Sequence, residues 1–291
     1  MISLRALRRK IRTVRSIQQI TRAMKMVSSM KLRRAREKAA ASQPFAQKIR
    51  GLLGTLMASV SGTADAEQLF SAHPLLSKKK GNRIAVVVIT ADRGLCGGYN
   101  SAIMRKTREF LHANRDKEIL IAAIGKKGRN ALVREKRELF KEYNNILGSL
   151  QFSGADELGE DIMGLFLCQC VAEVFVIHAQ FRSAIQQPVA VERILPVTID
   201  DIAGEKRDGA DFIYEPGPEK LLDYLLPYYV KSNIYHMLLG SLAAEQAARV
   251  ASMEAATKNA QGVIDALSLQ ANKLRQERIT QELSELIASG M

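Results

Sequence analysis

The chain has 291 residues, of which 47% are hydrophobic and 25% are charged, and its formal net charge at pH 7 is +13. This composition is typical of a soluble protein of one or two domains, and no run approaches the roughly twenty uncharged apolar residues of a membrane-spanning helix. Three cysteines in an otherwise ordinary composition predict a reducing compartment and no disulfide framework.

The first fifty residues hold the net charge. They contain 15 Lys and Arg residues and one acid, Glu37, which gives +14, while the rest of the chain carries −1 from 28 basic and 29 acidic residues. Apolar residues recur there in steps of three and four, as on one face of a helix: Leu4, Leu7, Ile11, Val14, Ile17, Ile20, Met24 and Val27. A helix of about forty residues would be roughly 60 Å long and needs a long apolar partner. The pattern is too long and regular for a removable leader, so we expect it in the mature protein.

A different pattern follows once this helix ends, between Pro44 and Leu76. Strands and helices alternate along the chain, which favours an open α/β sheet with right-handed crossovers. The expected strands are residues 84–90, 119–124, 139–143, 171–177 and 189–195, and the expected helices are residues 100–114, 127–135 and 156–170.

Helical periodicity returns at Glu219 and continues almost to the last residue. Roughly seventy residues of helix would extend about 100 Å. The heptad seam that we expect consists of Met253, Ala260, Leu267 and Leu274, with Ala256 and Val263 at the alternate positions. Because this helix is longer than the first by about 25 residues, its tip should extend past that partner, and another molecule must surround it.

We therefore expect an α/β protein in which two long terminal helices form an antiparallel coiled coil around an inserted Rossmann-like open α/β domain. The expected parts are a first shaft helix in residues 1–68, an α/β domain in residues 69–208 and a second shaft helix in residues 209–291.

A glycine-rich turn, residues 90–100, follows the first strand and opens a helix, where α/β proteins often bind phosphates. Its glycines have the order G-x-x-G-G, which differs from the dinucleotide fingerprint G-x-G-x-x-G, and the sequence has no Walker motif. The alternative is a tight turn that packs a helix onto the sheet, and the pattern favours this alternative.

Three kinds of partner fit the basic helix. Nucleic acid would reward clustered Arg and Lys, but residues 1–44 contain no Phe, Tyr or Trp for stacking on bases. A membrane-surface helix would fit the charge, yet it usually carries aromatic anchors that are missing here. The third kind, an acidic protein surface, fits best.

No residue set predicts catalysis or cofactor binding. His73, His112, His178 and His236 lie on different expected elements, and Cys168-x-Cys170 is the sole close pair of metal-ligating residues. No Ser, His and carboxylate set assembles by sequence logic. We expect no catalytic residue, no metal and no cofactor.

Three motifs in order resemble the gamma subunit of F-type ATP synthase of the bacterial type. Residues 11–28 contain IRTV and QQITRAMKMVS, as in the N-terminal helix of that family, and residues 92–100 (DRGLCGGYN) resemble its central turn. Residues 245–260 and 275–283 are similar to its C-terminal signature. The chain lacks the regulatory cysteine pair of chloroplast relatives in residues 195–208.

The resemblance implies a non-catalytic central rotor stalk that couples rotation of the membrane c-ring to conformational change at the catalytic sites of the alpha/beta ring, in ATP synthesis or hydrolysis. The implied partners are the alpha, beta and epsilon subunits and the c-ring, without nucleic acid or direct bilayer insertion. The implied location is peripheral, on the cytoplasmic face of the bacterial plasma membrane. The residues alone leave two alternatives open: a basic coiled-coil nucleic-acid-binding protein and an α/β nucleotide-binding enzyme with helical arms.

Site residues follow from the resemblance by position. The residues expected to contact beta subunits are Arg249 and Gln276, with Arg275, Thr280 and Glu282 beside them, and Met24 and Lys25 on the first helix. Phe212 and Tyr214 lie in the region expected to face the c-ring and epsilon. We also expect the Arg and Lys residues around the first helix to attract acidic loops of the ring.

Overall fold

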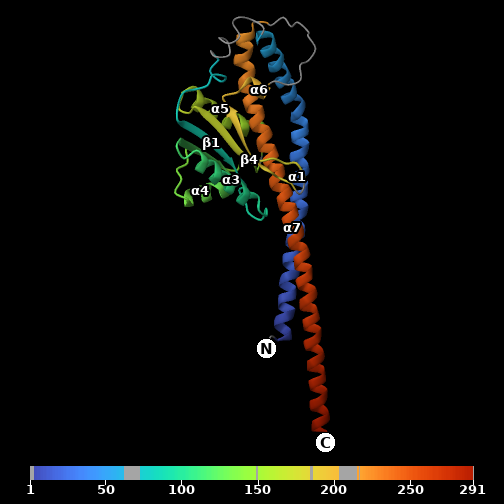
Figure 1. Ribbon diagram of the computed structural model, residues 1–291. Coiled ribbons are helices and arrows are strands. Elements are labelled where there is room, and N and C mark those ends of the chain that lie inside the picture. The colour runs from blue at the N-terminus through green and yellow to red at the C-terminus, as the bar shows by residue number, and fades with distance from the viewer. Residues whose placement is uncertain are drawn as a thin grey trace. The chain divides into compact units, whose positions relative to one another are not determined.

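The computed structural model describes residues 3–61, 73–148, 150–183, 186–202, 215 and 217–290. The elements in chain order are α1 (Leu4–Ser61), β1 (Arg83–Ile89), α3 (Tyr99–Ala113), β2 (Glu118–Ile124), α4 (Lys126–Arg134), β3 (Lys141–Tyr143), α5 (Phe152–Leu167), β4 (Glu173–Ala179), β5 (Val189–Leu195), α6 (Ile199–Ile202) and α7 (Pro218–Ser289) (Figure 1).

The chain forms two compact units. One consists of Met1–Met30 and Arg249–Met291, and we call it the two-helix unit; the other is Lys31–Ala248, and we call it the α/β unit. The long helices α1 and α7, of 58 and 72 residues, each contribute to both. Long terminal helices around an inserted α/β sheet are the predicted fold class.

The α/β unit is built on a five-stranded sheet in the order β3-β2-β1-β4-β5. The strands β3, β2, β1 and β4 are parallel, whereas β5 pairs antiparallel with β4. The predicted crossover pattern therefore holds for the four parallel strands, whereas the direction of the last strand was not predicted. Residues 180–188, between β4 and β5, are too few for a crossover helix, since a parallel connection needs about a dozen residues or more.

Both faces of the sheet are covered, and β1 lies at its centre. Val86 and Val88 belong to the core shared with α3 and α4, while Val87 and Ile89 belong to the core shared with α5, α1 and α7. Such two-sided burial explains why β1 is a continuous β-branched run without polar alternation.

The first helix continues past Pro44, which lies inside α1, and ends at Ser61, within the region where its end was predicted. Other element boundaries differ from the prediction by a few residues. The helix expected to end at Cys170 ends at Leu167, because Gln169 takes a left-handed conformation with φ 57°. We expected no disulfide framework; across this turn Cys168 and Cys170 are joined by a disulfide.

The two-helix unit is an antiparallel pair. Gln18 bonds Gln261, Thr21 bonds Thr257 and Lys25 bonds Glu254, each at 2.8 Å, so the partner's number falls as the number along α1 rises.

The seam on α1 differs from the predicted one after Val14. Ile17, Ile20 and Val27 are exposed by 48%, 58% and 49%. Met24 is half-buried as predicted, but the other buried or half-buried positions are Gln18, Thr21, Lys25 and Ser28, which continue the heptad that Leu4, Leu7, Ile11 and Val14 begin. In a heptad the seam positions alternate in steps of three and four residues. A seam that passed from Val14 to Ile17 would take two steps of three in a row, whereas Gln18 keeps the spacing that the first turns begin.

The seam on α7 differs at one of its two predicted alternate positions, since Ala256 is half-buried as predicted but Val263 is not. Met253 and Ala260 are buried as predicted, but Val263 is 47% exposed and the neighbouring Ile264 is buried in its place. The alternate contacts thus follow each main position by four residues, through Thr257, Ile264 and Ala271.

Candidate functional site on the two-helix unit

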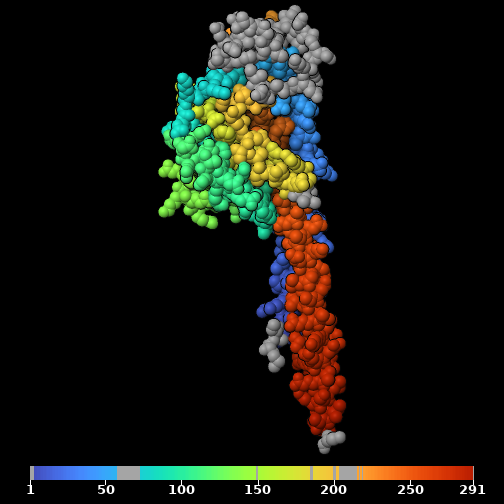
Figure 2. Space-filling view, in the orientation of Figure 1, coloured from blue at the N-terminus to red at the C-terminus, as the bar shows by residue number. Residues whose placement is uncertain are grey.

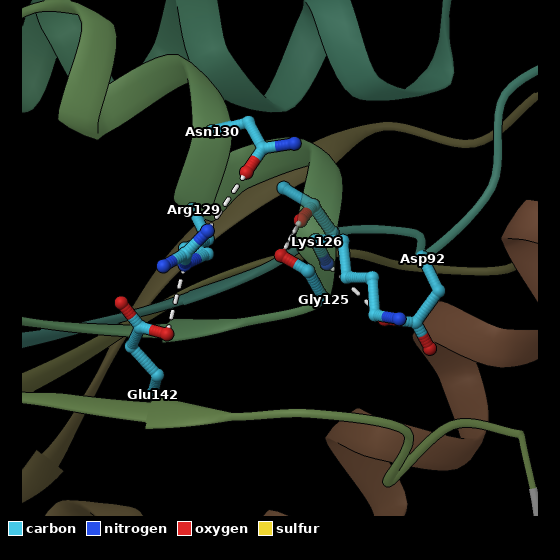
Figure 3. Close-up of polar contacts among 7 residues, drawn as sticks. Asp92, Gly125, Lys126, Arg129, Asn130 and Glu142 are labelled. Carbon is cyan, nitrogen blue, oxygen red and sulfur yellow. Dashed lines mark hydrogen bonds and ion pairs between the residues drawn. The ribbon is translucent and has the colours of Figure 1, made fainter.

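The glycine-rich turn uses its polar groups to hold α4. The carboxylate of Asp92 accepts a hydrogen bond from the backbone N–H of Lys126 at 3.1 Å, at the first position of α4 (Figure 3). On the same helix, Arg129 donates to Glu142 of β3 at 2.8 Å. Asp92 of the turn therefore caps the N-terminus of α4, the helix that follows β2, and ties it to the end of β1.

Close packing at the end of β1 also fixes the start of α4 against the sheet. Thr90 Oγ1 accepts the N–H of Gly128 at 2.8 Å, and a Cβ added at Gly125, where φ is +88°, would collide with the backbone carbonyl of Thr90. Glycine is therefore required at the turn between β2 and α4 for sterics and backbone conformation. These contacts show the turn packing a helix against the sheet, as its structural reading predicts.

The predicted contact residues form two clusters in the two-helix unit. The α7 part of the two-helix unit begins at Arg249, five residues before Glu254. Lys25 Nζ of α1 donates to Glu254 Oε1 at 2.8 Å, which places Met24 and Lys25 beside these turns of α7. We call Met24, Lys25, Arg249 and Glu254 the collar cluster. Arg275, Gln276, Thr280 and Glu282 form the tip cluster, on the end of α7.

The two clusters are separate sites. Arg249 and Gln276 are 27 residues apart on one helix, which is about 40 Å at 1.5 Å per residue. Arg249 is only 7% exposed. Its side chain therefore has little free surface, whereas the side chains of the tip cluster are exposed.

Residues of the tip cluster point in two directions around α7. Gln276 and Thr280 are four residues apart and share one face; Arg275 and Glu282 are seven apart and share another, roughly 130° away. Thr280 donates to the backbone carbonyl of Gln276 at 3.0 Å, and Glu282 accepts from Arg278 at 2.9 Å. Partners of this tip must approach from more than one side.

Exposed apolar side chains accompany both clusters, and sequence reasoning missed them as contact residues. On the tip they are Ile279, Leu283, Leu286 and Ile287, exposed by 49–70%, and on α1 they are Ile17, Ile20, Met26, Val27 and Met30, exposed by 48–64%. Figure 2 shows the last turns of α7, in red, with no other element over them on the visible face. Contiguous apolar surface of this kind marks a protein contact.

Two further predicted residues, Phe212 and Tyr214, lie outside the described residues. Within the described part of the chain, no helix is both long and apolar enough to cross a membrane.

Comparisons with known proteins agree with one another. The family model described as ATP synthase matches residues 3–291. The chain is 41% identical over 292 residues to the ATP synthase gamma chain of Anaeromyxobacter sp. (strain K), covering 100% of this chain and 99% of that one. It is 40% identical over 290 residues to that of Moorella thermoacetica, with the same coverage.

Solved structures show the same fold. The rotor of the Euglena gracilis mitochondrial ATP synthase includes a chain that matches with a TM-score of 0.63 at 18% identity, covering 95% of this chain and 98% of that one. A chain from the central stalk and c-ring structure of the Tetrahymena thermophila enzyme matches with a TM-score of 0.59 at 25% identity, over 81% of this chain and 99% of that one. The nucleic-acid alternative gains no support from these matches.

Proposed function

The chain belongs to the ATP synthase gamma chain family and is the central rotor stalk of that complex, and we propose that its two-helix unit transmits rotation to the alpha and beta subunits through the collar and tip clusters. One observation carries the proposal. From Arg275 to Ser289 every residue of α7 is exposed, although Ile279, Leu283, Leu286 and Ile287 are large and apolar. A single helix with such a surface is marginal in water unless another molecule covers it.

The mechanism that we propose depends on unequal contacts. The tip carries an amide and a hydroxyl on one face and a guanidinium and a carboxylate on another. Each surrounding subunit would therefore meet different chemistry at each rotor angle. A rotor biases a neighbour between conformations only through such differences in contact free energy.

Single residues take specific parts in this proposal. Gln276 and Thr280 face one beta subunit as hydrogen-bonding groups, and Arg275 and Glu282 face its neighbour. Arg249, which is buried, acts mainly by fixing the helix pair at the collar, with only the edge of its guanidinium reaching a beta loop.

Lys25 has a partner within the chain. Its ammonium group is 2.8 Å from Glu254, and the two side chains are 37% and 62% exposed. An ion pair this exposed contributes about 1 kcal/mol or less, so Lys25 can exchange Glu254 for an acidic loop of the ring at small cost. The proposed attraction of the basic sleeve to such loops requires this exchange.

We assign the chain no catalytic step of its own, because none of the contact residues forms a nucleophile, acid–base or metal set. The individual partners that we propose are the alpha, beta and epsilon subunits and the c-ring, with Phe212 and Tyr214 toward the last two. As part of this complex, the chain would lie on the cytoplasmic face of the bacterial plasma membrane. The proposed functional segments remain residues 1–68, 69–208 and 209–291.

Reconstitution tests the proposal. ATPase activity of the alpha and beta subunits of the same organism is measured with the wild-type chain, without it, and with Gln276→Ala. A net hydrogen bond of about 1 kcal/mol predicts a roughly fivefold loss of the chain-dependent rate. Gln47→Ala, the same change at an exposed position of α1 in the α/β unit, is the control and should leave the rate unchanged. Failure to assemble stoichiometrically, or equal rates for both variants, would refute the proposed contacts.

A charge-reversal series separates the two partners of Lys25. Lys25→Glu should lower the chain-dependent rate. If Glu254→Lys in the same chain restores it, the loss came from the helix pair; if only reversal of an acid in the beta loop restores it, the sleeve acts on the ring.

A further inference from the structure

The α/β unit contains a polar cavity that the rotor role does not use. Its volume is about 520 Å³, and it lies between the edge strand β5, the end of β4, and the helices α1 and α7. The polar residues on its wall are Arg50, His178, Gln180, Glu192, Arg193, Asp201, Tyr229, Asn233 and His236. Cavities of this size hold whole small molecules, and convergent polar groups are what such sites use to orient them.

Two residues of the wall, His178 and His236, each have a buried imidazole nitrogen without a partner among the described residues. His178 is 3% exposed, and its Nε2 is 2.9 Å from a carboxylate oxygen of Glu192. The hydrogen bond from His178 lowers the pKa of Glu192, against the opposing effect of burial, so the carboxylate accepts and Nε2 carries the hydrogen. In the neutral ring Nδ1 then presents a lone pair, and this buried atom has no partner among the described residues.

His236 repeats the arrangement. Burial lowers its pKa, which outweighs a hydrogen bond to the backbone of Ser42 that raises it. That bond is a donation from the ring to a carbonyl, so the neutral ring keeps a lone pair on Nε2. This nitrogen is also buried and unpartnered within the described part of the chain. Two buried acceptors without donors are costly and call for a ligand or water that donates to them.

The cavity also offers a cation. Arg193 forms an ion pair with Asp201, with 3.8 Å between Nη2 and a carboxylate oxygen. The carboxylate of Glu192 forms hydrogen bonds with the side chains of His178 and Gln180. Arg50 lies on the α1 side of the wall and forms no ion pair with the described residues. An uncompensated guanidinium attracts an anion, and its fork of N–H groups suits phosphate oxygens.

We propose that this cavity binds a phosphate-bearing anion that also carries O–H groups, with Arg50 donating to the anionic oxygens and with His178 Nδ1 and His236 Nε2 accepting from the O–H groups. Free hydrogen phosphate and a hydroxylated phosphomonoester share this chemistry. The volume of the cavity exceeds what a bare phosphate fills. The inference is independent of the contacts proposed for the two-helix unit.

Calorimetric titration of the full chain tests it, with AMP, inorganic phosphate and sulfate as probes. We would work at about pH 8, where an imidazole with its ordinary pKa of about 6.5 is neutral. Sulfate has the shape and charge of hydrogen phosphate but no O–H group, so the proposal predicts that it binds at least ten times more weakly. Tighter binding of AMP than of phosphate identifies a phosphomonoester, whereas equal binding identifies free phosphate.

Variants complete the test. Arg50→Gln removes the proposed cation from an exposed helical position and should weaken binding of the phosphate probe at least tenfold. Arg34→Gln, the same change on the same helix away from the cavity, should leave it unchanged. The proposal is overturned if no probe binds at millimolar concentration, if sulfate binds as tightly as phosphate, or if the two variants behave alike.

Discussion

Replacement of Ile20 by Ser tests two things: which residues of α1 form the seam of the helix pair, and whether another subunit covers the exposed face. The apolar pattern of the sequence places Ile20 in the seam, whereas the structure leaves it 58% exposed and buries Thr21 instead. Ile and Ser have similar helix propensities, so the change acts mainly through the side chain. In the isolated chain we expect the free energy of unfolding to change by less than about 0.5 kcal/mol.

Leu7→Ala provides the contrast. Leu7 is fully buried in the same helix pair, and loss of a buried Leu side chain costs about 2–5 kcal/mol. Urea unfolding followed by circular dichroism, with hydrogen exchange of the α1 amides, measures both variants. If Ile20→Ser destabilised the pair as strongly as Leu7→Ala, the assigned seam would be wrong.

Binding to the alpha/beta ring, unlike the free energy of unfolding, should be sensitive to the replacement of Ile20. Complete burial of an Ile side chain contributes about 2.5 kcal/mol, and 58% of it remains to be buried, which leaves about 1.5 kcal/mol for a partner. Ile20→Ser should therefore weaken binding to the alpha/beta ring about tenfold. The control is Val133→Ser, a 50% exposed apolar residue of α4, which should not affect binding. Unchanged binding by the Ile20 variant would show that the ring does not cover this face.

Three other outcomes follow from the described contacts. Gly125→Ala forces a left-handed residue against a backbone carbonyl and should cost more than about 3 kcal/mol in urea unfolding, while Gly51→Ala, in open space on α1, should be neutral or stabilising by about 0.5 kcal/mol. The pKa of Glu192 is lowered by its hydrogen bond from His178, so its contribution is complete above the ordinary pKa of 4.5 and is lost as pH falls through the lower native pKa. Glu192→Gln should therefore flatten that acid part of the stability curve, and an unchanged curve would contradict it. Leu286→Ser, at a position 68% exposed, should leave the melting temperature of the chain unchanged but weaken ring binding measurably; a lowered melting temperature would place this side chain in the chain's own core.

Much of the α/β unit was predictable because its signals are local. The β-branched run before Thr90 and the apolar run before Gly125 are central strands buried on both faces, which few other structures explain. The direction of β5 was not predicted, since strand propensity is the same for parallel and antiparallel pairs. Only the length of the connection after Ala179 distinguishes them.

The candidate site was predictable only in part, for a different reason. Motif resemblance located Arg249 and Gln276 but contained no geometry, so their separation of about 40 Å and the two faces of the tip came from the structure. The cavity histidines had no sequence signal at all. His178 and His236 are 58 positions apart, and the fold alone brings both to the wall of one cavity.

The segment from Ile17 to Met30 shows why the seam was misread. Two sets of positions, one residue apart, repeat with the same heptad spacing: an apolar set that includes Ile17, Ile20 and Val27, and a polar set through Thr21 and Ser28. Hydrophobic periodicity selects the first set on the assumption that apolar residues pack within their own chain. The structure assigns the second set to the chain's own seam and leaves the first facing outward. A helix pair can tolerate polar contacts at its seam if its other apolar face is buried by a partner along the same turns. The failure of the local rule at this place is therefore what the proposed enclosure by other subunits would produce, and under that proposal these turns are where the enclosure begins.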